Sequence, residues 1–371
     1  MFAEVGGLKD DVEHEVEFYV RKNLNGEDLS FEEAMRLFEL PLPVLGRIAD
    51  KIRKEKCGEL VTFVADRNIN YTNVCVSKCK FCAFYARKKE EEYVLSYDEI
   101  LKKIEEARKY GVTQILLQGG MNPELGIEWF EELFRLIKSK FPEIQLHALS
   151  PPEIHFLSEK EGLSIEEVLR RLIDAGMDSL PGGGAEVLSD RVRKIVSPRK
   201  VDSDGWIEVM RTAHRLGIRS SATMMFGHVE RDEDIVEHLF RIRDLQSETG
   251  GFTAFVSWTF QPERTELYEK GIVREPVSAT RYLQVLAIAR TVLHNFRNIQ
   301  ASWLTQDFDI AALALFFGAN DFGGIMLEEN VVRATGKDFR PARIEEIVQA
   351  VKAVGRPVAQ RTTLYEVIRT F

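Results

Sequence analysis

The sequence predicts an α/β protein built as a (β/α)8 barrel of the TIM type. Between about residues 60 and 324, eight strand-like segments alternate with amphipathic helical segments at even spacing. An open doubly wound sheet is the alternative, but the number and spacing of the segments favour the closed form. We expect an N-terminal helical cap in residues 1–56, the barrel in residues 57–324, and a C-terminal helical extension, packed on the barrel, in residues 325–371.

The expected strands are short runs, rich in apolar and β-branched residues, that end close to glycine, proline or polar residues. They are residues 61–66, 113–118, 144–150, 177–181, 220–226, 252–260, 298–304 and the weaker 319–324. The helical segments place apolar residues three and four positions apart, and several close with glycine. They include residues 97–111, 164–176, 206–217 and 234–246, with another at 342–355 in the extension.

The composition favours a small molecule as the binding partner. Lys and Arg total 50 against 59 Asp and Glu, and the two signs are interspersed, which argues against a dedicated nucleic-acid or anionic-membrane surface. The first residues lack the features of a secretory signal, and no apolar run approaches the roughly 18 residues that a membrane span requires. We therefore expect a cytoplasmic protein, with no membrane insertion, whose cysteines meet a reducing environment.

Three cysteines lie within eight residues, Cys75, Cys79 and Cys82 in the run RNINYTNVCVSKCKFCAFYARK. Thiolates at this C-x3-C-x2-C spacing can hold three irons of a 4Fe-4S cluster and leave the fourth iron without a protein ligand. A zinc site needs a fourth ligand, and the nearest candidates, Cys57 and His147, fit no zinc spacing. Four cysteines in 371 residues are also too few to indicate a disulfide framework.

The cysteine spacing resembles that of the radical S-adenosylmethionine (SAM) enzymes, in which the open iron binds SAM. Cleavage of SAM then gives a 5′-deoxyadenosyl radical, and the protein must hold a substrate C–H bond close to C5′. The segments HALSPPEI, DSLPGGGAE, TMMFGHVE, ETGGFTAFVSWTFQP, NIQASWLTQ, GANDFGGIMLEENV and AQRTTLY are similar to the radical SAM enzymes of the futalosine pathway to menaquinone. This likeness extends from about residue 60 to the C-terminus.

The resemblance implies an enzyme that closes a ring in dehypoxanthine futalosine, a ribose bearing a 3-substituted benzoate. The radical takes the ribose C4′ hydrogen, the carbon radical adds to the aromatic ring, and loss of a proton and an electron restores aromaticity. The implied cofactors are a 4Fe-4S cluster and SAM, and the implied partner is a low-potential reductant such as flavodoxin or ferredoxin. Aminofutalosine synthase and the deazaflavin-forming radical SAM synthases are alternatives, and an iron–sulfur electron carrier or sensor is the alternative outside enzymes.

A barrel of this type carries its chemistry at the C-terminal ends of its strands. The glycine pair after the second strand lets backbone approach a ligand, and the family uses such a pair for the methionine amino group of SAM. Glu186 follows three consecutive glycines and is a candidate for the SAM ribose, as Arg191 is for the SAM carboxylate. The expected SAM contacts are Phe81, Tyr85, Gln118, Gly119, Gly120, Ser150, Glu186, Arg191 and Met225.

Substrate and base residues are predicted from position alone. The candidates for the base that removes the ring proton are His228, Glu230, Asp321 and Glu329. Trp258, Gln261, Trp303 and Asn320 are expected to contact the substrate, although tryptophans in strands are more often part of a core. No arginine in the sequence is a convincing partner for the substrate carboxylate.

Overall fold

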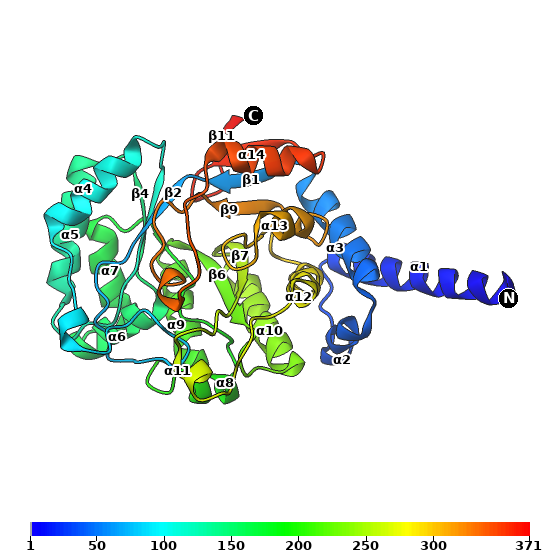
Figure 1. The fold of residues 1–371 in the computed structure, drawn as a ribbon, viewed down its shortest axis with the longest axis horizontal. Coiled ribbons are helices and arrows are strands. Elements are labelled where there is room, and N and C mark those ends of the chain that lie inside the picture. The colour runs from blue at the N-terminus through cyan, green and yellow to red at the C-terminus, as the bar shows by residue number, and fades with distance from the viewer. Residues whose placement is uncertain (1) are drawn as a thin grey trace.

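The computed structural model describes residues 2–371, with side chains described from Val12 onward. Its strands form one curled sheet in the order β11-β10-β1-β9-β8-β7-β6-β5-β4-β3-β2 (Figure 1). The strands are β1 (Val61–Val64), β2 (Asp66–Ile69), β3 (Gln114–Leu117), β4 (Gln145–Ala148), β5 (Ser179–Leu180), β6 (Arg219–Phe226), β7 (Phe252–Thr259), β8 (Asn298–Gln300), β9 (Asp321–Gly324), β10 (Val358–Arg361) and β11 (Val367–Thr370).

The sheet closes into a barrel because Ala65 alone separates β1 from β2. Strand β1 pairs with β9, and β2 pairs with β3, so one bent segment joins the two ends of the parallel sheet. The neighbouring pairs from β2 through β9 are all parallel. The predicted (β/α)8 barrel is therefore confirmed.

Helices surround the barrel, and α1 extends away from it (Figure 1). The α-helices are α1 (Phe2–Leu24), α2 (Phe31–Arg36), α3 (Leu42–Cys57), α4 (Tyr97–Arg108), α5 (Ile127–Lys140), α6 (Pro151–Glu161), α7 (Ile165–Ala175), α8 (Asp190–Val196), α9 (Ser203–Arg215), α10 (Asp232–Thr249), α11 (Glu266–Glu269), α12 (Ala279–Val292), α13 (Phe308–Ala314) and α14 (Ile344–Ala353). Short 3-10 turns lie at Leu37–Glu39, Lys89–Glu91 and Arg333–Thr335.

Helix α7 shows why the predicted helices begin and end where they do. Ser164 caps its N-terminus and forms a reciprocal capping box with Glu167. Gly176 ends the helix in the left-handed region with φ 119°, a conformation that costs glycine least. Between these ends, Leu169 and Leu172 are fully buried, as the apolar spacing predicts.

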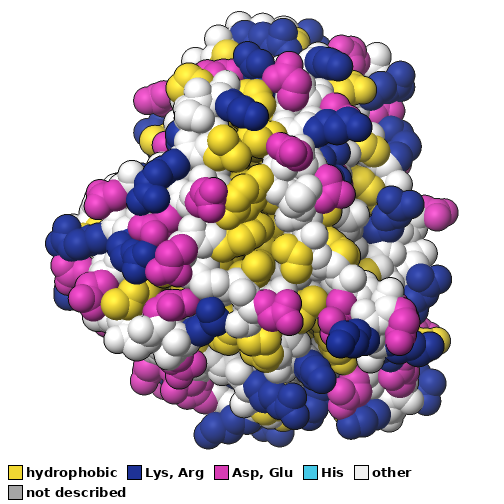
Figure 2. All heavy atoms as spheres, turned by 90° about the vertical axis from the view of Figure 1, so that its left-hand side faces the viewer, with side chains coloured by type: hydrophobic (Ala, Val, Ile, Leu, Met, Phe, Trp, Pro, Cys, Tyr) yellow, Lys and Arg dark blue, Asp and Glu magenta, His cyan; other side chains and the backbone are white. Residues whose placement is uncertain are grey.

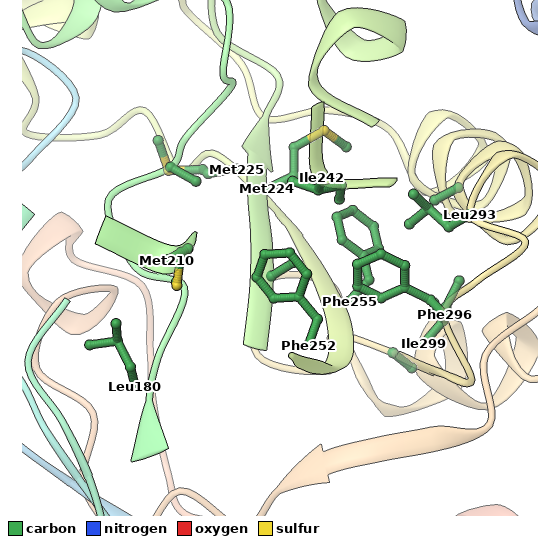
Figure 3. Close-up of a cluster of buried hydrophobic side chains, with 14 of the residues drawn as sticks. Leu180, Met210, Met224, Met225, Ile242, Phe252, Phe255, Leu293, Phe296 and Ile299 are labelled. Atoms are coloured by element: carbon green, nitrogen blue, oxygen red, sulfur yellow. The ribbon is translucent and has the colours of Figure 1, made fainter. Parts of the chain in front are cut away.

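Alternation along strand β6 separates the outer core from the inside of the barrel. Met224 and Phe226 are fully buried, and Figure 3 shows Met224 among apolar side chains from the neighbouring strands and helices. Residues of the opposite parity, Arg219, Ser221 and Thr223, border a cavity inside the barrel. Because successive side chains of a strand point to opposite faces, one strand supplies both layers.

Several predicted strands are shorter than expected. The segment 61–66 is divided between β1 and β2, 177–181 is reduced to Ser179–Leu180, and 298–304 is reduced to Asn298–Gln300. The residues left out at the C-terminal ends of the last two, Pro181 and 301–304, border the cavity inside the barrel.

The C-terminal extension is not only helical, which corrects the prediction for residues 325–371. After α14, strand β10 pairs in parallel with β1, and β11 returns antiparallel beside β10. Each strand has four residues, and β10 pairs with residues almost 300 positions away in the sequence, so local periodicity gave no sign of it. The division into cap, barrel and extension stays a prediction.

The surface shown in Figure 2 agrees with the interspersed charges of the sequence, since basic and acidic side chains are mixed over that face. Hydrophobic side chains show between them along the middle of this face. In the part of the chain that the structure describes, no helix is both long and apolar enough to cross a membrane.

Candidate active site

The cysteine loop lies over the C-terminal ends of the strands. It leaves β2 at Ile69 and is held by backbone hydrogen bonds, including Lys80 N to Val196 O at 2.8 Å and Leu267 N to Lys80 O at 3.1 Å. Its three cysteines are free thiols, and all three border one cavity of about 270 Å3, which we call the mouth chamber.

The glycine pair after β3 is required by the way this loop packs. A Cβ at Gly120 would lie 2.1 Å from the carbonyl oxygen of Val74 and 2.9 Å from the Cβ of Cys75. A Cβ at Gly119 would lie 2.7 Å from the ring of Tyr71. The missing side chains therefore let the loop sit directly on the strand ends.

The thiols fit a cluster better than a single metal ion. Among the described residues, no three His, Cys, Asp or Glu side chains are grouped so that they could hold one metal ion. A cubane cluster makes a different demand, because each of three thiolates binds its own iron. Burial raises the pKa of the Cys79 thiol to about 12, so its thiolate needs a cationic partner such as iron.

Opposite the cysteines, the mouth chamber contains a buried charge pair that joins two loops. Lys200 Nζ lies 3.0 Å from Glu186 Oε1 and 5.3 Å from the centre of the Phe81 ring. Arg193 is also close to Glu186, with its Nη1 3.4 Å from Oε2. Glu186 therefore borders the mouth chamber, as expected for a SAM contact, and its carboxylate lies close to two cations, Lys200 and Arg193.

Glu153 is a second carboxyl group of this chamber. Its Oε1 accepts hydrogen bonds from the Tyr71 hydroxyl at 2.6 Å and from Gly119 N at 3.1 Å, and its Oε2 accepts one from the Ser150 hydroxyl. Burial raises the pKa of Glu153 to about 7. It therefore ties the first turn of α6 to the glycine pair and to the start of the cysteine loop.

A second cavity of about 290 Å3 lies inside the barrel, and we call it the inner chamber. Gln118, Gly183 and Trp258 border both chambers, so the two meet at this level. The inner chamber is lined by polar side chains from strand after strand, among them Asp66 and His147. Burial raises the pKa of Asp66 to about 6 and lowers that of His147 to about 3, so this imidazole is neutral near pH 7.

Comparison with known proteins identifies the family. A model of the radical SAM superfamily matches residues 69–242, and one described as the CofH/MqnC C-terminal region matches residues 249–370. The chain is 44% identical over 355 residues to the cyclic dehypoxanthine futalosine synthase of Halalkalibacterium halodurans, covering 95% of each chain. The chain belongs to the radical SAM superfamily.

Other radical SAM relatives and solved structures extend the comparison. The chain is 43% identical to the cyclic dehypoxanthine futalosine synthase of Streptomyces coelicolor, over 90% of this chain and 84% of that one. It is 42% identical to a 5-amino-6-(D-ribitylamino)uracil--L-tyrosine 4-hydroxyphenyl transferase of Methanosarcina barkeri, over 91% and 90%. The fold is similar to methylornithine synthase (PylB), with a TM-score of 0.73, 19% identity and coverage of 91% and 96%. It is also similar to the hydrogenase maturase HydG, with a TM-score of 0.74, 16% identity and coverage of 98% and 82%.

As a radical SAM enzyme, the protein cleaves SAM and uses a 4Fe-4S cluster. Most of the predicted cofactor residues come together at the mouth. The mouth chamber is bordered by Cys75, Phe81, Cys79, Cys82, Tyr85, Gln118, Gly119, Gly120, Ser150, Glu186, Met225, Trp258 and Gln261. Trp303 and Glu329 border the inner chamber.

Three predicted residues near the end of β6 do not border either chamber. His228 is turned back on its own segment, with Nε2 3.0 Å from Met225 O and Nδ1 accepting from Val229 N at 2.8 Å. Glu230 accepts hydrogen bonds from Gly227 N and His228 N. Arg191 is held by an ion pair with Asp234 and donates to the carbonyl of Val229. All three stabilise the turn that follows β6.

Asn320 and Asp321 lie at the N-terminal end of β9, away from the mouth. Asp321 is fully buried, accepts from Thr62 Oγ1 at 2.6 Å, and accepts two hydrogen bonds from one edge of the Arg361 guanidinium, from Nε at 2.5 Å and from Nη2 at 3.0 Å. Asn320 Oδ1 accepts from Arg290 Nη2 at 2.8 Å. Both residues hold the bottom of the barrel together.

Several residues that border the two chambers are not among those that the sequence predicts for the site. Glu153 and Lys200 border the mouth chamber, and Asp66, Arg219 and Arg361 border the inner chamber. For Glu153 the sequence held one signal, since Ser150 and Glu153 stand three positions apart directly after a strand. The others carry no local motif, because only the closed barrel brings them to a cavity.

Proposed function

We propose that this radical SAM enzyme cyclises dehypoxanthine futalosine in menaquinone biosynthesis. The observation that carries the proposal is the near-full-length identity, 44% and 43%, to two cyclic dehypoxanthine futalosine synthases. The structure supports it with a polar inner chamber next to the cysteine loop, large enough to receive a ribose-linked aromatic acid.

Under this proposal, Cys75, Cys79 and Cys82 hold the cluster at the mouth. The backbone at Gly119 and Gly120 would bind the methionine part of SAM, and Glu186, which pairs with Lys200, would bind the ribose hydroxyls. Phe81, Tyr85 and Met225 form the apolar wall for the adenine or sulfonium, with Gln118 and Ser150 as polar neighbours.

When bound, the 4Fe-4S cluster and SAM would supply the electron and the hydrogen-abstracting radical that cyclisation needs, and the cluster would be the acceptor for the electron released on rearomatisation. The residues of the chain orient the substrate and exclude water. Trp258 borders both chambers and therefore lies where the substrate meets SAM, and Trp303, fixed by a 3.0 Å bond from its Nε1 to Gly324 O, forms part of the wall for the substrate ring. Gln261 borders the mouth chamber and adds a polar contact there.

The base that takes the ring proton is, in this proposal, a carboxylate of the inner chamber. Of the four predicted bases, Glu329 borders this chamber, but both of its oxygens accept backbone N–H groups of residues 331–333. Asp66 borders it as well, and its Oδ1 accepts from Met326 N at 2.8 Å. We assign the proton transfer to Asp66, whose raised pKa of about 6 suits a base near neutral pH.

The test is anaerobic turnover. The purified protein is reconstituted with iron and sulfide, reduced with dithionite, and incubated with SAM and dehypoxanthine futalosine. We expect 5′-deoxyadenosine and the cyclic product in equal amounts, identified by mass spectrometry. Deoxyadenosine without a cyclised product would contradict the proposed substrate. We also propose a low-potential reductant, a flavodoxin or ferredoxin of a reducing cytoplasm, in place of dithionite in the cell.

A second candidate is the transferase reaction, because the relative from Methanosarcina barkeri is almost as similar, at 42% identity. The same assay distinguishes it. L-tyrosine and 5-amino-6-(D-ribitylamino)uracil replace dehypoxanthine futalosine, and enolpyruvyl benzoate tests the aminofutalosine synthase reaction. We expect product from dehypoxanthine futalosine alone.

A further inference from the structure

One row of inward side chains crosses five neighbouring strands of the barrel. The register pairs Asn68 with Leu116, Leu116 with His147, His147 with Ser179, and Ser179 with Arg219. All five residues border the inner chamber. Residues in register across a parallel sheet share a face, so the row forms a continuous girdle around one side of the cavity.

Two members of this girdle have polar atoms that no protein group satisfies. Asn68 Oδ1 is buried without a hydrogen-bond partner. The guanidinium of Arg219 forms no hydrogen bond or ion pair with any described residue, although it opens a strand whose inward residues Ser221 and Thr223 line the same chamber. Buried polar atoms are normally paired, so the unpaired Oδ1 of Asn68, beside the exposed and unpartnered Arg219, indicates that this girdle can bind a polar ligand.

The other charges of the inner chamber restrict where an anion can sit. Asp66 and Glu329 are carboxyl groups that repel a second carboxylate. Arg361 also borders the chamber, but Asp321 accepts from its Nε and Nη2, and the carbonyl of Thr362 accepts from its Nη1. Within the described residues, Arg219 is therefore the chamber's unpaired cation.

We propose that Arg219 binds the benzoate carboxylate of the substrate. The inference rests on the proposed function and adds the orientation of the substrate. Arg219 begins β6, whereas Met225 of the same strand borders the mouth chamber. The carboxylate thus points toward the N-terminal ends of the strands, and the ribose points toward SAM. The planar, forked guanidinium matches a carboxylate with two parallel hydrogen bonds.

The experiment compares an acid with its uncharged isostere. Binding of dehypoxanthine futalosine and of its carboxamide analogue is measured by calorimetry on the reconstituted enzyme with SAM but without reductant, so that no turnover occurs. We expect Arg219→Gln to weaken binding of the acid about 10- to 100-fold and to change binding of the amide by less than about 2-fold. Arg219→Lys, which keeps the charge without the fork, should fall between.

The matched control is Arg215→Gln, which removes the same charge from an exposed arginine that pairs with Glu248 and borders neither chamber. It should leave both affinities unchanged. Because Arg219 is exposed at the bottom of the barrel and unpaired, the melting temperature and cluster absorption of Arg219→Gln should match those of the wild type. If Arg219→Gln binds the acid and the amide with equally weakened affinity, or with unchanged affinity, the inference about Arg219 is wrong. The proposed function would still be supported by formation of the cyclic product by the wild-type enzyme. If the wild-type enzyme forms no cyclic product, the proposed function itself is wrong.

Discussion

The mouth chamber and the inner chamber are specified by different kinds of sequence information. The mouth is made mainly of short continuous segments: the cysteine loop, the glycine pair after β3 and the segment around Glu186. The inner chamber is made of single side chains, such as Asp66, His147 and Arg219, that stand tens of residues apart. A motif can therefore reveal the mouth, but only closure of the barrel reveals the inner chamber.

The two chambers also differ in how their charges are satisfied. In the mouth chamber, Glu186 is paired with Lys200, and Glu153 accepts three hydrogen bonds. In the inner chamber, Asp66 has no ion pair and Arg219 has no hydrogen-bond partner among the described residues. A buried carboxyl group without an ion-pair partner, such as Asp66, costs stability, whereas Arg219 is exposed and available for pairing, so the inner chamber is better suited to binding a ligand than to stabilising the fold.

The largest effect should come from the mouth. Replacing Cys79, the buried cysteine of the loop, with alanine removes one of three iron ligands. We expect Cys79→Ala to lose the iron–sulfur absorption and all formation of 5′-deoxyadenosine, while the barrel stays folded by circular dichroism. Cys57→Ala is the control, because that thiol bonds the carbonyl of Arg297 at 3.0 Å, outside the mouth chamber. Cluster absorption that persists in Cys79→Ala would contradict the assignment of this ligand.

The next effect should come from the floor of the inner chamber. Arg361→Met leaves Asp321 fully buried without its ion-pair partner. We expect the free energy of unfolding to fall by about 3 to 5 kcal/mol in urea denaturation, with the cysteine loop unaltered. The double variant Arg361→Met, Asp321→Asn should recover part of the loss, because the unpaired charge is then gone. Equal stability of the single and double variants would show that packing, not charge, explains the effect.

The sequence predicted the fold and the mouth well for physical reasons that are local. Capping residues such as Ser164 and Gly176 fix helix ends within a few residues, and alternation along 220–226 fixes which side chains face inward. The prediction failed where distant parts of the chain decide the structure. Strand β10 exists because it pairs with Val61–Val64, and Asp321 was expected at the mouth although it begins its strand at the opposite end.

Position after a strand does not by itself place a side chain in either chamber. His228 and Glu230 stand at the end of β6, as expected, yet their polar atoms are used by the turn that they form. Asp66 falls at the end of the first expected strand, where nothing in the local sequence marks it as a base. Only the bend at Ala65 and the closure of the barrel turn its carboxyl group into the chamber.

A smaller effect should follow from closing the space at the glycine pair. In Gly120→Ala, the new Cβ would overlap the carbonyl oxygen of Val74, which belongs to the backbone and cannot rotate away. We expect a loss of about 3 kcal/mol in the free energy of unfolding and a lower iron content per chain. Gly126→Ala is the control, because that glycine has a φ of −91° and the added Cβ would meet only the ends of flexible Glu and Lys side chains. A normal iron content in Gly120→Ala would show that the loop can move without losing the cluster.

The smallest effect is expected at Asp66, and it has opposite signs for stability and activity. The carboxyl pKa is raised to about 6 in the folded protein, against about 3.9 in an unfolded chain. Below about pH 4 the carboxyl group is protonated in both the folded and the unfolded wild type, so the wild type and Asp66→Asn should be about equally stable. As the pH rises from about 4 to about 6, the unfolded wild type ionises while burial disfavours the charge in the folded protein, so the wild type loses stability; above about pH 6, Asp66→Asn should stay more stable by a little under about 3 kcal/mol.

The same substitution should reduce cyclisation, because an amide cannot take the ring proton but can still accept the hydrogen bond from Met326 N. In Asp66→Asn we expect 5′-deoxyadenosine to form as before while the yield of cyclic product falls. In the wild type, the ratio of cyclic product to 5′-deoxyadenosine should rise as the pH increases through about 6, because the carboxylate is then ionised. The exposed Asp338→Asn is the control for both measurements. If Asp66→Asn gains stability but forms the cyclic product at the normal rate, Asp66 destabilises the folded protein without acting as the base, and another group takes the ring proton.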